Sequence, residues 1–424
     1  MTTVNPPLPQ VTMYSLGLQQ LDIIHTVIKS IVFFYLIVLV PLVLSYTIIF
    51  PICTALYIYN PSVMHSFIDI VASTWYITPV TWLMMNGTKF TIYTNPSTLS
   101  VLQSHQLSCC SCMMVSNHPT TADWIYLWYL QYNIVSLRQL KIVMKSQLRQ
   151  LIPLGWPLQF AIHFFLRRNW LNDRLHITHL IEYYTQRTVP YKLQLLLFPE
   201  GTDLHDKAVK RSNEYAVNHS LPEYKYVLHP RTTGFTYMLQ LLRQYHSCDY
   251  IYDITIAYPY HIDKYTNKPN KNPQKLEQLI SGVFPSNVMF YVQLFENNQL
   301  PTSDVELNKW CEKQWNDKEE RLANVYSHAN GKFVEPDGSN SIQYHIPYTV
   351  YIKFVCIFIG VFIYGMLSLY CMYQSYYIKL YMVFSSIIMS AFTYANGLDV
   401  FFVHRELYKR KKHAYQQALR SQNN

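Results

Sequence analysis

The chain has 424 residues, of which 50% are hydrophobic and only 14% are charged, whereas soluble domains usually carry about 25% charged residues. This composition excludes a disordered chain, and the 11 Gly and 22 Pro exclude a collagen-like or linker-dominated one. The net charge is +9, which suits nucleic acid, an anionic membrane surface or an anionic substrate. The eight cysteines have the spacing of neither a disulfide framework nor a zinc site.

The N-terminal 88 residues fall into two parts. Residues 1–29 form a polar segment in which we read no cleavable secretory signal. Residues 30–88 form an N-terminal membrane region, in which Asp69 is the one formally charged residue. The stretch 30–59 is long enough to span a bilayer, which takes about 20 apolar residues. The stretch 67–85 contains Pro79, and it could equally span the membrane or re-enter or lie at its surface.

Residues 89–346 alternate β-like runs with amphipathic stretches, which predicts an α/β domain with a central sheet covered by helices. The predicted strands are residues 90–93, 112–115, 140–144, 193–198, 226–228, 253–257 and 288–294. The predicted helices are residues 123–132, 175–186, 233–245 and 304–327. The last helix begins with a capping box formed by Ser303 and Glu306. Turn residues at 330–331 and 336–338 predict the end of the domain.

The C-terminal region is apolar and then basic. Residues 347–400 are predicted to form a transmembrane hairpin, from two uncharged runs, 354–378 and 380–398, that only Lys379 separates. Residues 401–424 are a basic tail. Positive charge beside a span favours the cytoplasmic side, and a double crossing places the soluble domain of residues 89–346 there too. The tail could rest on anionic lipid or be merely solvated.

Two segments carry candidate chemistry. In the first, His118 follows a predicted strand and lies five residues before Asp123, with Pro119 suited to the first position of a helix. A carboxylate that accepts one ring N–H leaves the other nitrogen as a base. With no Gly-x-Ser-x-Gly motif, this base would activate a hydroxyl of the substrate. The alternative is a helix cap without chemistry.

In the second segment, residues 195–203, an apolar strand runs into a turn with Pro and Gly. Loops at strand ends are where α/β sheets bind ligands. Glu200 and Thr202 could offer an acceptor and a hydroxyl to a polyol substrate. The alternative is an ordinary strand-to-loop turn.

Together, these segments resemble the glycerolipid acyltransferase family, whose marks are His-x4-Asp and Phe-Pro-Glu-Gly-Thr. Residues 145–168 and 227–235 resemble two further blocks of that family. Details at residues 203–204, 211–213, 300–303 and 310–311 resemble its lysocardiolipin acyltransferase branch. The resemblance covers residues 89–327 and marks 89–346 as an acyltransferase domain.

The resemblance implies acyl transfer from acyl-CoA, as co-substrate, to a lysophospholipid of the lysocardiolipin, lysophosphatidylinositol or lysophosphatidic acid type. It implies no bound cofactor and no metal, and it makes His118 the general base and Asp123 its orienting partner. A multi-pass protein of the endoplasmic reticulum membrane is the family-based expectation, and no oligomeric state is predicted. The substrate-binding residues that it implies are Asn117, Lys145, Arg168, Glu200, Gly201, Thr202 and Arg231.

One position departs from the family pattern. Many relatives place Arg directly after Glu-Gly-Thr, where it is thought to hold the acceptor phosphate, but this chain has Asp203. Arg168, Lys145 and Arg231 are therefore the candidates for phosphate binding, since Arg binds two phosphate oxygens at once. Each could instead be a surface charge or part of a salt bridge. The departure favours an acceptor whose phosphate is substituted.

Two other functions compete with this one. A CoA-independent phospholipid transacylase would use the same base. A non-catalytic lipid-binding membrane protein is a second alternative, against which the intact His118, Asp123 and Glu200 argue. Nucleic-acid binding fits poorly, because the basic residues are spread along a chain with apolar spans and no recognition motif is present.

Overall fold

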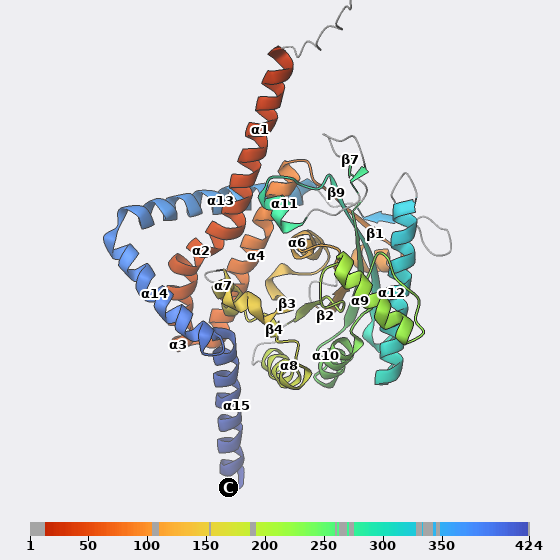
Figure 1. Ribbon diagram of the computed structural model, residues 1–424. Helices are drawn as coiled ribbons and strands as arrows, with labels where there is room; N and C mark the ends of the chain where they lie inside the picture. Colours follow the sequence, from red (N-terminus) through yellow and green to blue (C-terminus); the bar gives the residue numbers. More distant parts are fainter. Residues whose placement is uncertain are drawn as a thin grey trace, which may run out of the picture.

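At the centre of the protein is a mixed eight-stranded sheet (Figure 1), as seen in a computed structural model that describes residues 13–103, 110–151, 154–186, 192–258, 261–262, 269–270, 275–327, 333, 342–344 and 348–422. The order across the sheet is β10-β1-β9-β6-β2-β5-β3-β4. In chain order the strands are β1 (Lys89–Thr94), β2 (Cys112–Ser116), β3 (Leu140–Lys145), β4 (Phe164–Leu166), β5 (Gln194–Leu197), β6 (Tyr250–Ala257), β9 (Asn287–Glu296) and β10 (Ile342–Tyr344). A separate pair joins β7 (His261–Ile262) to β8 (Pro269–Asn270).

The predicted strands are confirmed at β1, β2, β3, β5, β6 and β9. The strand predicted at residues 226–228 is wrong. There, the backbone N–H groups of Lys225, Tyr226 and Val227 donate to the Glu319 carboxylate at 2.8–3.1 Å, so a side chain rather than a neighbouring strand satisfies them. The sequence reading missed β4 and β10, which are too short to show an alternating pattern.

Strands β6, β2, β5, β3 and β4 run parallel, so their carboxyl ends lie along one edge of the sheet. Right-handed crossovers place α6 (Asp123–Ile134) on one face and α8 (Trp170–Thr185) and α10 (Thr232–Gln244) on the other. These helices confirm the predicted ones. The other helices between the strands are α5 (Pro96–Gln103), α7 (Gly155–Phe160), α9 (Asp206–Asn218) and α11 (Leu276–Ile280).

Helix α12 (Asp304–Ser327) packs on β6 and α10, and it confirms the prediction for residues 304–327. Its predicted capping box is only half confirmed, because the Glu306 carboxylate accepts from the Ser303 hydroxyl and not from the Ser303 backbone N–H. The Ser303 hydroxyl accepts the Glu306 N–H at 3.3 Å and lies 2.9 Å from the Glu306 carboxylate. The turn residues predicted at 330–331 and 336–338 lie outside the described residues.

The N-terminal apolar stretch is one long helical run along the side of the domain (Figure 1). It consists of α1 (Met13–Phe34), α2 (Val40–Leu44) and α3 (Thr54–Tyr59), with π-helical turns at Tyr35–Leu39 and Ser45–Cys53 between them. Gln20–Tyr59 is long and apolar enough to cross a membrane, as predicted for residues 30–59.

The second apolar stretch forms α4 (Pro61–Met85), which packs against α6 and the C-terminal α13 (Tyr348–Gln374). Among the described helices, those that could cross a membrane are Gln20–Tyr59, α13 and α14 (Tyr376–Tyr394), and α4 is not one of them. Its Asp69 carboxylate is buried and accepts from the ammonium group of Lys141 on β3 at 2.8 Å. Polar contacts thus attach α4 to the catalytic sheet.

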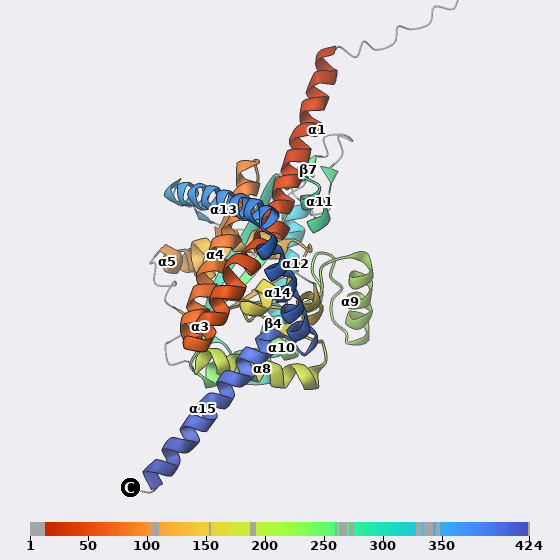
Figure 2. The ribbon, with the colours of Figure 1, turned by 90° about the vertical axis from the view of Figure 1, so that its left-hand side faces the viewer.

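The C-terminal spans are confirmed as helices, but the predicted boundaries are displaced. Helix α13 ends before Ser375, whose hydroxyl caps α14 by accepting the Ile378 N–H at 3.3 Å, and the predicted divider Lys379 lies inside α14. The expected tail begins within α15 (Leu398–Gln422), a helix that projects from the body of the protein (Figure 2).

The buried pair of Asp69 and Lys141 gives the first testable prediction. Asp69→Asn leaves a buried ammonium group without its counter-charge, so we expect a loss of about 3–5 kcal/mol in the free energy of unfolding. Thermal unfolding of the full chain in detergent measures it. Glu277→Gln on the exposed side of α11 is the control, with an expected change within about 0.5 kcal/mol. Equal effects of both substitutions would show that the pair does not attach α4.

Candidate active site

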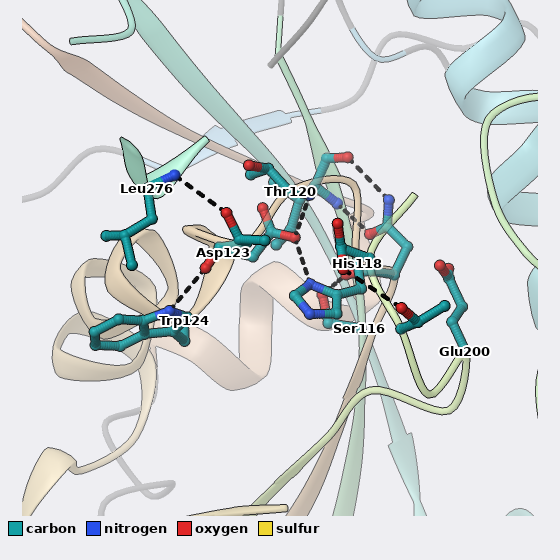
Figure 3. A network of polar contacts seen from close by, with 12 residues as sticks. Ser116, His118, Thr120, Asp123, Trp124, Glu200 and Leu276 are labelled. Carbon is teal, nitrogen blue, oxygen red and sulfur yellow. Dashed lines mark hydrogen bonds and ion pairs between the residues drawn. The ribbon is translucent and has the colours of Figure 1, made fainter. Parts of the chain in front are cut away.

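The structure brings His118 and Asp123 together at the carboxyl edge of the sheet (Figure 3). The Nδ1 atom of His118 lies 2.9 Å from Oδ2 of Asp123, and the imidazole ring stacks on Phe198 with centroids 4.4 Å apart. The His118 side chain is 19% exposed and the Asp123 side chain is fully buried. The carboxylate therefore fixes Nδ1 as the protonated nitrogen and leaves Nε2 as an acceptor.

The local chain geometry explains why His118 and Asp123 lie in contact. Strand β2 ends at Ser116, and the chain turns through His118 before α6 begins at Asp123. The Thr120 N–H donates to the Asp123 carboxylate at 2.9 Å, which closes the turn. The Leu204 N–H donates to the His118 carbonyl at 2.8 Å and ties the second motif to the first.

Asn117 uses its side chain within the protein, and its substrate contact stays a prediction. Its side chain is fully buried, its amide N–H₂ donates to the Ile256 carbonyl at 3.1 Å, and its carbonyl accepts the Ile256 N–H at 2.7 Å. Both polar groups of the amide are thus used to join the end of β2 to β6.

Tyr258, which the sequence reading missed, completes the surroundings of Asp123. It follows β6, is buried, and donates its hydroxyl to the second carboxylate oxygen of Asp123. Burial raises the pKa of Asp123, while the hydrogen bonds from His118, Tyr258 and the Thr120 N–H oppose that shift. No spacing in the sequence indicates this contact, because 135 residues separate the partners.

Glu200 lies beside the pair (Figure 3). It is 3% exposed, and its Oε1 accepts the indole N–H of Trp315 on α12 at 3.1 Å. Burial is the main cause that raises the pKa of Glu200 to about 8. At neutral pH its carboxyl group is therefore mostly protonated. The structure gives Glu200 a partner within the protein, and its contact with substrate stays a prediction.

Two of the predicted cations meet at the Glu-Gly-Thr turn. The Arg168 guanidinium donates to the Gly201 carbonyl, and a Cβ placed on Gly201 would lie 3.4 Å from the Arg231 guanidinium. Gly201 has φ +72°, which suits a residue without a side chain. Partial burial and the nearby Arg231 lower the pKa of Arg168, and Asp203 opposes them. The two like charges create a positive potential that an anion would neutralise.

The remaining predicted residues border this turn. Lys145 is exposed at the end of β3 and pairs in register with Leu166, two residues before Arg168. The Thr202 hydroxyl donates to the Asp203 carboxylate at 3.4 Å. Substrate contacts of Lys145 and Thr202 stay predictions. Within the described part of the chain, no group of His, Cys, Asp and Glu side chains could hold a metal.

Comparison with known protein families assigns this chain to a family. The acyltransferase family matches residues 103–259, which include the His118–Asp123 pair and the Glu200 turn. The family described as acyltransferase C-terminus matches residues 278–356, which include α12. The chain belongs to the glycerolipid acyltransferase family. It is therefore an enzyme of the acyltransferase class, as the motifs predicted.

Curated relatives agree with this assignment. The chain is 37% identical to lysocardiolipin acyltransferase 1 of Gallus gallus over 278 residues, which cover 65% of this chain and 67% of the relative. It is 41% identical to the Mus musculus protein of the same name, over 50% of this chain and 54% of the relative. It is 35% identical to lysophosphatidylinositol acyltransferase 10 of Caenorhabditis elegans, over 51% of this chain and 53% of the relative. The matches thus span between about half and two thirds of the length of these relatives.

The buried Glu200 makes the stability of this acyltransferase pH-dependent. The pKa of Glu200 in the folded protein, about 8, is above the ordinary value of 4.5. The contribution of Glu200 to folding stability is therefore fully present below about pH 4.5 and is lost as the pH rises through 8. Glu200→Gln keeps the oxygen that accepts from Trp315 but does not ionise. We therefore expect the unfolding temperature of the variant to fall less than that of the wild type between pH 5 and 9.

The readout is the difference in unfolding temperature between the wild type and Glu200→Gln at each pH. A difference is needed because burial raises the pKa of Asp123 in both proteins. Two parallel curves of unfolding temperature against pH would contradict the assignment of a buried, titrating Glu200. Asp304→Asn at the exposed start of α12 is the control and should leave the wild-type curve unchanged.

Proposed function

We propose that this acyltransferase moves a fatty acyl group from acyl-CoA to the free hydroxyl of a lysophospholipid, with His118 as the general base. The observation that carries the proposal is the buried Asp123 carboxylate 2.9 Å from the His118 Nδ1, which leaves Nε2 to accept a proton. Asp123 favours the charged form of the ring once the proton has arrived.

The reaction follows from these roles. Nε2 of His118 takes the proton of the acceptor hydroxyl as the oxygen attacks the thioester carbonyl. The C–S bond breaks, an ester forms, and CoA leaves as a thiolate that takes up a proton. Among the described residues, no hydroxyl or thiol side chain is hydrogen-bonded to the His118 ring, which favours a substrate hydroxyl as the nucleophile over one from the enzyme.

The acceptor is proposed to be an anionic lysophospholipid with a substituted phosphate. Arg168 and Arg231 meet at Gly201, within the turn that is tied to the His118 backbone, so a phosphate bound there would lie near the base. Asp203 disfavours the doubly charged phosphate of lysophosphatidic acid. Curated relatives named for lysocardiolipin and lysophosphatidylinositol support the substituted class.

We further propose that the enzyme resides in the endoplasmic reticulum membrane with its catalytic domain in the cytoplasm. Helices Gln20–Tyr59, α13 and α14 are long and apolar enough to cross a bilayer. The basic residues that follow α14 in α15, including Arg405, Lys409 and Arg410, favour the cytoplasmic side for that end.

His118→Ala should lower acceptor-dependent CoA release by roughly 10²–10⁴-fold, because a placed general base contributes about that much. Purified protein in liposomes would be given oleoyl-CoA and a panel of lysophospholipids. His205→Ala, which removes an exposed histidine beside Asp203, is the matched control and should keep wild-type turnover.

Each outcome of that panel has a consequence. Wild-type turnover by folded His118→Ala protein would reject the base. A strong preference for lysophosphatidic acid would reject the acceptor class, and acyl transfer between phospholipids without CoA would favour the transacylase.

Tyr258→Phe should reduce kcat about 10- to 100-fold with an unchanged KM, since a hydrogen bond to a charged group contributes roughly 1.5–3 kcal/mol. The hydroxyl lowers the pKa of Asp123, so its loss should also shift the acid limb of the kcat/KM profile to higher pH. Tyr237→Phe removes a hydroxyl that lies 2.7 Å from Thr178 and serves as the control. An unshifted acid limb would show that Tyr258 does not position the pair.

A further inference from the structure

The junction between α14 and α15 lies against the catalytic domain through buried polar contacts. We call residues 393–399 the elbow. The chain bends at Asn396 and Gly397, which have φ +105° and +102°, and the Gly397 N–H donates to the Phe392 carbonyl at 2.9 Å. The elbow lies beyond residue 356, where the match to the acyltransferase C-terminus family ends.

The strongest contact of the elbow is a buried ion pair. The Arg149 guanidinium, which follows β3, donates to the Asp399 carboxylate at 2.6 Å, with side-chain exposures of 7% and 0%. The guanidinium also lies over the ring of Phe165 on β4, 4.7 Å from its centroid. Asp399 is in the first turn of α15, where a negative charge is favourable.

Gln159 of α7 adds a second buried connection. Its amide N–H₂ donates to the Arg149 carbonyl at 3.1 Å and to the Thr393 hydroxyl at 3.0 Å. Its carbonyl accepts the Leu398 N–H at 2.9 Å. One fully buried amide therefore holds the end of α14, the start of α15 and the loop after β3 together.

The elbow also contacts the residue next to Arg168, the cation at the Glu-Gly-Thr turn. Arg167 donates to the Asn396 side chain at 3.4 Å. The next residue, Arg168, has φ +63°, a conformation that a non-glycine residue adopts only when its surroundings hold it. The Asp173 carboxylate accepts the N–H groups of Arg167 and Asn169 on either side, at 2.8 and 3.0 Å.

We propose that the elbow positions Arg168 for the acceptor phosphate, and so links the seating of the α14 span in the membrane to acceptor binding. This inference rests on the proposed function, in which Arg168 binds that phosphate. A span that shifts along its axis would move Thr393 and Asp399 with it. Through Gln159, Arg149 and Arg167 it would also move the loops that follow β3 and β4, which begin next to Lys145 and contain Arg168. Arg149, Gln159 and Asp399 are positioning residues, since none of them contacts the reacting groups.

The test uses the full chain in liposomes and compares Asp399→Asn with the wild type. We expect the KM for the lysophospholipid to rise about tenfold, because small misplacements of a binding group weaken binding steeply, while kcat and the KM for acyl-CoA change less than about twofold. Asp399→Glu should recover part of the loss. Glu182→Gln is the matched control, because it removes the 3.9 Å pair between α8 and Lys411 of α15 and leaves the elbow intact.

A second variant and a binding assay keep the outcome clear. Thr393→Val removes one hydroxyl from α14 with little risk to folding. It should raise the KM for the lysophospholipid about two- to threefold, which corresponds to the loss of one neutral hydrogen bond.

A fluorescent lysophospholipid bound to His118→Ala protein, with and without Asp399→Asn, reports affinity without turnover. Equal affinities, or a fall in kcat with an unchanged KM, would overturn the inference. An inactive wild type that still shows weaker lipid binding in Asp399→Asn would reject the proposed reaction alone.

Discussion

The burial of the Asp123 carboxylate beneath His118 is the constraint on which the rest of the site depends. A buried carboxylate is costly unless donors surround it, and here two donors come from the turn after β2 and a third from the end of β6. His118 comes from the end of β2, the Thr120 N–H from the following turn, and Tyr258 from the end of β6. The sheet must therefore hold β2 and β6 in register, and the buried Asn117 amide joins the two strands next to the pair.

Helix α12 holds this edge of the sheet in place, although it lies outside residues 103–259 of the first family match. Its Trp315 donates to Glu200, and its Glu319 accepts from the backbone of residues 225–227. Its Lys318 is fully buried and lies 2.5 Å from the Asp253 carboxylate of β6. Buried ion pairs add little net stability but are costly to break, so they favour a single arrangement of the elements they join. The second family segment thus holds the loops of the first in place.

Buried ion pairs also join the apolar helices to the catalytic domain. Helix α4 contributes Asp69 to a buried pair with the catalytic sheet, and the elbow contributes Asp399 to another. Both carboxylates come from apolar segments that the low charge content marked as membrane regions. Each one pairs with a cation of the catalytic domain, from β3 or from the loop after it. The apolar segments and the sheet are therefore joined by directed polar contacts as well as by apolar packing.

The amino-acid sequence by itself determined the class of fold, the His118–Asp123 pair, the Glu-Gly-Thr turn, the long apolar helices and the Ser303 cap of α12. These features depend on local periodicity, turn residues and short spacing, which a linear pattern records. Tertiary structure decided that Asn117 joins strands, that Glu200 pairs with Trp315, that Tyr258 completes the site and that the elbow contacts the loops after β3 and β4. These roles depend on residues more than 100 positions apart, and only the register of the sheet and the packing of helices on it bring such residues together.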